Sequence, residues 1–191
     1  MTPVPHAHAP LPLPLPAVLS ETELSNAFLG NLVEVCFATE DHQRTMEGLV
    51  RLGIGPFRVY TFDSGSTTGR TYRGDPEDWS LKGCFAVNNG LTYEIMQPLT
   101  GRTVLRDHLN RHGEGVHHLA FDCDGVPWNR RVETFAERGF PQTQTGRWQD
   151  QNAFSFFGTE DATTACFETY HFPEGFDWPE PDVWYPGPPP R

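Results

Sequence analysis

The sequence predicts an α+β fold built from two similar halves. Residues 31–39 and 116–123 are short apolar segments with an ionisable side chain near the start, and each precedes a helix-like stretch. An offset of 84 residues places Glu34 on His118 and Gly55 on Gly139, with the same order of segments after each. Each half ends in a hairpin-like pair of strands. Both halves therefore have the order βαβββ.

The first half starts with the strand 31–39. Glu40 and Asp41 then offer an N-terminal cap for a helix that Gly53 ends. The remaining elements predicted for this half are a strand at 58–62, a Gly/Thr/Arg/Asp-rich connector at 64–80, and a hairpin with strands 84–87 and 91–96 around an Asn-Asn-Gly turn.

The second half repeats this order. Residues 122–125 are expected to cap a helix over 128–138. The other elements predicted for it are a hairpin with strands 154–157 and 163–170 around a turn at 158–161, and, between the halves, a short helix at 103–112.

Proline-rich ends flank this unit. Residues 1–20 contain prolines throughout and no basic segment, which predicts an extended or disordered tail rather than a signal peptide. Residues 21–30 suggest a short helical approach. The domain is expected at 21–172, with modules at about 29–100 and 113–172, followed by a Pro-rich arm at 173–191 whose tryptophans should hold it against the fold.

Composition restricts the partners. The formal net charge is −11 and the pI near 5.0, whereas nucleic acids and anionic membranes require a basic surface. No apolar run is long enough for a membrane span. The four cysteines form no CxxC pair, so free buried thiols are expected. We expect a cytoplasmic protein that acts on a small molecule, with no nucleic acid or membrane partner.

Alternation along the strands selects the candidate site residues. In a regular strand His117 and His118 face opposite ways. His118 shares a face with Ala120 and Asp122, which are small and leave room for a ligand, whereas His117 lies on the bulky apolar face that should pack on a helix. Glu34 likewise lies opposite the bulky side of its strand.

These segments resemble the vicinal oxygen chelate superfamily, the group of glyoxalases, methylmalonyl-CoA epimerases, extradiol dioxygenases and bleomycin-resistance proteins. The resemblance covers roughly residues 29–172, and Gly113-Glu-Gly-Val-His-His-Leu-Ala-Phe121 is its most specific part. It implies two βαβββ modules that form a curved mixed sheet around a central cleft. It also implies a divalent metal held by one residue from the first and one from the last strand of each module, here Glu34, Glu94, His118 and Glu168.

The first of these positions departs from the family pattern. Glyoxalase- and epimerase-like members usually carry histidine where this chain has Glu34. Three carboxylates and one imidazole favour the harder ions among Mg, Mn, Fe(II), Co and Zn, and leave Glu34 or Glu168 available as a catalytic base. No nucleotide cofactor is implied.

The resemblance implies an isomerase, epimerase or lyase that moves a proton next to a carbonyl group. A metal-free acid/base enzyme and a ligand-binding or sequestration protein of the same fold are the alternatives. The aromatic content favours a substrate larger than methylglyoxal, such as an aromatic or polyketide-like carbonyl compound. A monomer and a homodimer both remain open, since one chain supplies all four site positions while dimers are frequent among relatives.

Further candidates would bind the substrate. Arg73 and Arg147 could hold a carboxylate, although solvated surface cations have the same pattern. Trp148, Phe154 and Tyr170 could line an aromatic pocket, although core packing explains such residues equally well.

Overall fold

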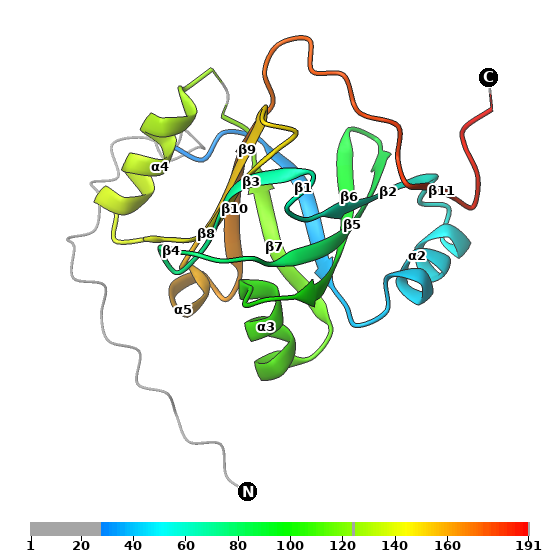
Figure 1. Cartoon of the computed structure of the whole chain (residues 1–191), viewed down its shortest axis with the longest axis horizontal. Helices are drawn as coiled ribbons and strands as arrows, with labels where there is room; N and C mark the ends of the chain where they lie inside the picture. Colours follow the sequence, from blue (N-terminus) through cyan, green and yellow to red (C-terminus); the bar gives the residue numbers. More distant parts are fainter. Residues whose placement is uncertain (1–27, 124, 191) are drawn as a thin grey trace, which may run out of the picture.

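The computed structural model describes residues 28–190 with the exception of residue 124. The predicted tail at 1–20 and most of the predicted helical approach at 21–30 lie outside the described residues. Figure 1 shows one curled sheet with short helices around it. The strands are β1 Leu32–Ala38, β2 Phe57–Phe62, β3 Thr67–Tyr72, β4 Asp75–Pro76, β5 Ser80–Asn88, β6 Leu91–Thr100, β7 Gly115–Phe121, β8 Gln142–Trp148, β9 Asn152–Phe157, β10 Cys166–His171 and β11 Val183–Tyr185. The helices are α2 His42–Arg51, α3 Val104–His112, α4 Trp128–Glu137 and α5 Glu160–Thr163. The α+β class is confirmed.

The sheet is built from two four-stranded modules joined at their first strands. Its order is β11-β2-β5-β6-β1-β7-β10-β9-β8-β3-β4. In each module the first strand pairs in parallel with the last, β1 with β6 and β7 with β10, and the two first strands pair with each other in antiparallel fashion. The four strands β6, β1, β7 and β10 therefore lie side by side at the middle of the sheet.

The repeat holds with one change of register. Helices α2 and α4 begin at His42 and Trp128 and end at Arg51 and Glu137, which is an offset of 86 rather than 84. The glycines that follow them are Gly53 and Gly139, with φ of 89° and 86°, a left-handed conformation that suits glycine. The predicted match of Gly55 with Gly139 is therefore wrong, because the segment from His118 to the start of α4 is two residues longer than that from Glu34 to the start of α2.

That loop does not cap its helix as predicted. Asp41 caps α2, since its carboxylate accepts a hydrogen bond from the Arg44 amide at 3.0 Å. Asp122 instead accepts from the backbone amide of Asn31 at 3.0 Å, and Pro127 occupies the N-cap of α4 without a side-chain bond. The carboxylate thus ties the start of the first module to the second.

Two segments outside the modules extend the sheet. The connector 64–80 contains β3, which crosses to the far module and pairs with β8. The C-terminal arm contains β11, which pairs with β2, and Tyr60 donates a hydrogen bond to the Pro179 carbonyl at 2.9 Å. The arm therefore lies on the fold, as its aromatic residues predict.

Packing leaves the concave side of the sheet as the main core. The larger cluster of buried residues lies inside the curl and includes residues of α3, which closes one end (Figure 1). Helix α2 packs on β5 and β6, and α4 on β8, β9 and β10. The outward-facing residues Val35 and Phe37 of β1 are therefore only half-buried.

All four cysteines are free and buried. Among the described residues, no helix is long and apolar enough to cross a membrane.

Candidate metal and catalytic site

The structure brings four ionisable side chains from the four central strands to one point on the concave face. Glu34 lies in β1, Glu94 in β6, His118 in β7 and Glu168 in β10, and their ligand atoms all lie within 4.8 Å of one another. The register explains this convergence. Cys36 pairs with both His118 and Glu94, and Ala120 pairs with both Glu34 and Glu168, so the four are opposite or diagonal neighbours on one face.

The ring nitrogen of His118 lies at the centre of the group. Its Nε2 is 3.0 Å from Glu94 Oε2, 2.9 Å from Glu168 Oε2 and 3.9 Å from Glu34 Oε1. All four residues are at most 5% exposed. Nevertheless Nε2 of His118 and Oε2 of Glu94 have no hydrogen-bond partner with suitable geometry. Buried polar atoms without partners are rare, and these two point to the same place.

Burial and mutual repulsion change the protonation of these groups. Burial, followed by the charge of Glu94, raises the pKa of Glu34 well above its usual value. Burial also raises the pKa of Glu168 to about 7, against the effect of His118. The pKa of His118 is likewise raised, because interactions with Cys36 and then Glu168 outweigh burial, which alone would favour the neutral ring. In the cluster the carboxyl groups therefore retain protons, which a divalent cation would displace on binding.

The donor set fits a divalent metal ion. Carboxylate oxygens and one imidazole nitrogen are ligands for Mg, Mn, Fe(II), Co and Zn, and the two atoms without partners are one from each class. Cys36 lies beside Glu94 and His118 in a second possible group. Burial and the charge of Glu94 raise the pKa of its thiol well above the usual value, so the oxygen-rich set is the better one.

The two adjacent histidines do not face opposite ways, so that prediction is wrong. Cys36 pairs with His118 and Phe37 with Val116, which leaves His117 as an extra residue in β7. Such a β-bulge interrupts the alternation and redirects side chains. As a result Nδ1 of His117 lies 2.8 Å from Nδ1 of His118, and both rings contact Phe156.

This contact can set the tautomer of His118. One of the two Nδ1 atoms must carry the hydrogen. Burial, and then the charge of His118, lower the pKa of His117 well below its usual value, which keeps this ring neutral. When a neutral His117 accepts from Nδ1–H of His118, Nε2 is the nitrogen of His118 that can lose its proton and bind an ion, as partners of metal-binding histidines commonly arrange.

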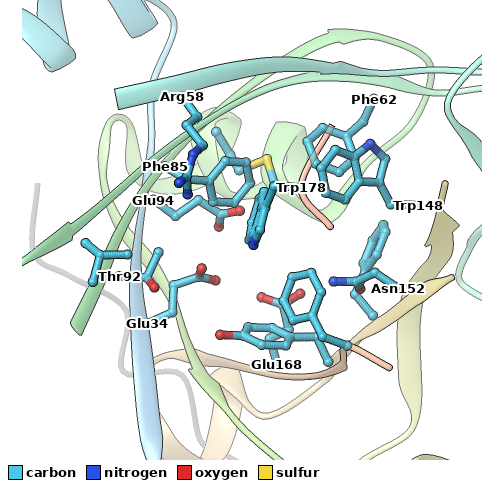
Figure 2. A pocket seen from close by; sticks show the side chains of 15 residues that line it. Glu34, Arg58, Phe62, Phe85, Thr92, Glu94, Trp148, Asn152, Glu168 and Trp178 are labelled. Atoms are coloured by element: carbon cyan, nitrogen blue, oxygen red, sulfur yellow. The ribbon is translucent and has the colours of Figure 1, made fainter. Parts of the chain in front are cut away.

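A mostly apolar cavity of about 70 Å³ lies above the cluster (Figure 2). Glu34, Glu94 and Glu168 are part of its wall, whereas His118 is fully buried beneath. A buried water needs roughly 10–15 Å³ on this scale, so the cavity has room for a small group of several atoms. The other lining residues are Arg58, Phe62, Phe85, Val87, Thr92, Met96, Trp148, Asn152, Phe154, Tyr170, Phe172 and Trp178.

The predicted substrate-binding residues divide into two groups. Trp148, Phe154 and Tyr170 line the cavity. Arg73 and Arg147 do not. Arg73 donates hydrogen bonds to Asp107 at 2.8 Å and to the Tyr72 hydroxyl at 2.9 Å. Arg147 is exposed on β8, between the inward-facing Gly146 and Trp148.

Sequence reasoning missed several lining residues of the cavity, among them Arg58, Asn152 and Trp178. Arg58 is the second residue of β2, Asn152 is the first residue of β9, and Trp178 lies in the C-terminal arm. The alternation of Arg58, Tyr60 and Phe62 is a signal that could have placed Arg58 on the cavity face. The position of Trp178 follows from how the arm folds back, for which the sequence holds no local signal.

The fold and site define a class of proteins with two βαβββ modules and a cleft shared between them. A sequence profile described as the glyoxalase/bleomycin resistance protein/dioxygenase superfamily matches residues 34–156. The chain belongs to this superfamily. The range includes Glu34, Glu94 and His118 and ends before Glu168.

Solved structures show the same fold at low sequence identity. A methylmalonyl-CoA epimerase from Mycobacterium tuberculosis is 15% identical with a TM-score of 0.58, and the match covers 78% of this chain and 93% of that one. A hypothetical protein, BH1468 from Bacillus halodurans C-125, is 16% identical with a TM-score of 0.58, covering 77% and 97%. A variant of the Streptomyces coelicolor methylmalonyl-CoA epimerase in complex with 2-nitronate-propionyl-CoA is 15% identical with a TM-score of 0.53, covering 79% and 99%. A search among curated proteins found no match.

Proposed function

We propose that this protein is an enzyme that moves a proton at a carbon next to a carbonyl group of a small molecule, as an isomerase, epimerase or lyase. The observation that carries the proposal is the convergence of Glu34, Glu94, Glu168 and the Nε2 atom of His118 beneath a mostly apolar cavity that can admit part of a small molecule. The methylmalonyl-CoA epimerases that share the fold support the isomerase or epimerase branch.

The four residues would hold a divalent metal ion. When bound, such an ion supplies a positive charge that stabilises an enolate-like oxygen. His118, Glu94 and Glu168 are the better holding set, because both carboxylates lie within 3.0 Å of Nε2 whereas Glu34 lies 3.9 Å away.

Glu34 is then the best-placed proton carrier. It lines the cavity, it lies farther from His118, and its neighbourhood favours the protonated form when the cluster is otherwise anionic. Glu168 also lines the cavity and is the second candidate base. The aromatic walls, Trp148 and Tyr170 among them, would exclude water and hold the substrate carbon against these carboxylates.

The test is hydrogen exchange at carbon. The purified protein with Mg²⁺ is incubated in heavy water with a panel of enolisable acids, esters and ketones, and loss of the α-proton signal is followed by NMR. We expect exchange with at least one compound and a loss of about 10²-fold or more in Glu34→Gln or Glu168→Gln. Glu40→Gln is the matched control, since Glu40 is an exposed carboxylate paired with Arg106.

Two results would contradict the proposal. Exchange at the wild-type rate in both cavity variants would show that these carboxylates are not the base. Tight binding of a compound without any exchange in the wild type would instead favour a ligand-binding or sequestration protein, a role that the apolar cavity also suits.

A further inference from the structure

A single arginine lies in the wall of the cavity. In β2 the residues Arg58, Tyr60 and Phe62 alternate toward the concave side, while Phe57 and Val59 pack outward in the cluster beneath α2. The Arg58 side chain reaches the cavity above Glu34 and Glu94, as Figure 2 shows. A guanidinium group therefore borders a cavity whose other wall residues are carboxylates, apolar groups and small polar groups.

Two indole rings of the C-terminal arm hold this guanidinium. Arg58 Cζ lies 5.4 Å from the centre of the Trp178 ring and 5.2 Å from that of the Trp184 ring. Trp184 is the cross-strand partner of Arg58 in the pairing of β11 with β2. Stacking on aromatic faces fixes the plane of a guanidinium and leaves its N–H edge available for bidentate hydrogen bonds.

No carboxylate neutralises Arg58. Among the described residues, none lies within 4.0 Å of its guanidinium, whereas Arg70, Arg73 and Arg106 are paired with Asp78, Asp107 and Glu40. In a chain of formal net charge −11, with acidic side chains in ample supply, this arginine faces the cavity rather than a carboxylate. The N–H groups of Arg58 are therefore available to donate hydrogen bonds to a ligand in the cavity.

A second polar group in the wall also lacks a partner. Asn152 is 5% exposed and its Oδ1 is buried without a hydrogen bond. Its amide nitrogen points into the cavity across from Trp178, whereas the oxygen is turned back toward the wall (Figure 2). An amide N–H in this position can donate a hydrogen bond to an oxygen atom of a ligand.

We propose that Arg58, packed against Trp178 and Trp184, binds a carboxylate group of the substrate at the cavity wall, and that Asn152 donates a hydrogen bond to another oxygen atom of the same molecule. The substrate class is therefore a carboxylic acid that also carries a carbonyl group, whose oxygen accepts this hydrogen bond. One planar guanidinium fork beside two indole rings suits a planar carboxylate, whereas a phosphate is usually bound by several donors. The assignment of the reacting end to Glu34 and Glu168 rests on the proposed function above. The binding role of Arg58 does not.

The test uses acids and their neutral esters as probes. Phenylpyruvate, benzoylacetate and benzoylformate, each with its methyl ester, are titrated into the purified full chain, and binding is followed by calorimetry and tryptophan fluorescence. The variants are Arg58→Gln, Arg58→Lys and Asn152→Leu. Arg147→Gln is the matched control, because Arg147 is an exposed strand arginine outside the cavity. Thermal melting checks that each variant is folded.

We expect at least one acid to bind the wild type and the Arg147→Gln control equally. Its binding should weaken about tenfold or more in Arg58→Gln and less in Arg58→Lys, because lysine keeps the charge but loses the fork. The methyl ester should bind Arg58→Gln and wild type alike. Asn152→Leu should weaken the binding of these keto acids, because leucine cannot donate a hydrogen bond to their carbonyl oxygen.

Several outcomes would overturn the inference. These are equal binding of the acid to wild type and a folded Arg58→Gln variant, equal binding of acid and ester to the wild type, or no binding of any acid below about 10 mM. Binding needs neither metal nor turnover. Binding that depends on Arg58, without any proton exchange, would therefore support this inference and contradict the proposed function. Proton exchange at the same rate in wild type and Arg58→Gln would support the proposed function and contradict this inference.

Discussion

Replacing Glu168 by glutamine should stabilise the protein when a chelator has removed divalent ions. The pKa of Glu168 is raised from its ordinary 4.5 to about 7, chiefly by burial. The folded state therefore holds a proton between these pH values that the unfolded state releases, so the stability of the wild type falls as pH rises through this window. A pKa shift of this size lowers the unfolding free energy of the wild type by about 3 kcal/mol at pH 8. The side-chain amide in Glu168→Gln carries no charge, so the variant avoids this loss.

The assay is urea unfolding of wild type and Glu168→Gln at pH 4.5 and pH 8 in chelator. We expect the variant to be more stable by about 3 kcal/mol at pH 8, with the advantage disappearing near pH 4.5. Adding Mn²⁺ or Mg²⁺ should reverse the order, because an ion that binds only the folded wild-type cluster stabilises it.

Glu114→Gln is a control of opposite sign. Hydrogen bonds from Arg44, then Thr39, hold the pKa of the Glu114 carboxyl down at about 2, so its contribution is present at neutral pH and lost in acid. The pair is exposed, which limits the loss to less than about 1 kcal/mol. A Glu168→Gln variant that is less stable than wild type at pH 8 in chelator would refute the reasoning about the cluster.

Three further outcomes are expected. His117→Phe should lower the affinity for a divalent ion by about 10–100-fold, measured by competition with a chelator, because the ring that orients His118 no longer accepts its Nδ1 hydrogen; unchanged affinity would contradict that role. Trp148→Ala should cost about 3–5 kcal/mol of unfolding free energy, since this 2% exposed ring packs on Tyr60 and Phe62; a loss below about 1 kcal/mol would be inconsistent with its packing. Arg73→Gln should leave ligand binding unchanged and cost less than about 1 kcal/mol, because its partner Asp107 lies outside the cavity; weakened binding would show that Arg73 reaches the substrate.

The sequence was sufficient for the module order and for the face on which Glu34 lies. Both follow from local rules, the alternation of side chains along a strand and the cap that Asp41 provides for α2. The four proposed ligands also lie together in the structure. Their convergence depends on the pairing of β1 with β6 and β7, for which the internal repeat was the main signal.

Two kinds of feature could not be predicted from the sequence: a β-bulge made by one extra residue, and the pairing of segments that lie far apart in the chain. One residue too many in β7 turns His117 toward His118, and no composition signal marks such a bulge. The crossing of β3 to β8, and the return of the arm that sets Trp178 against Arg58, are contacts between distant segments. Only the paired partner, not the local pattern, determines them.

Metal content most directly tests the account that Glu34, Glu94, His118 and Glu168 form a chelate site. Elemental analysis is made on the wild type, purified without chelator, and on a Glu94→Ala/His118→Ala double variant whose folding is checked by circular dichroism. We predict about one divalent ion per chain in the wild type and none in the variant. No retained ion in the wild type, even after soaking with Mn²⁺, Fe²⁺ or Co²⁺, would contradict the account.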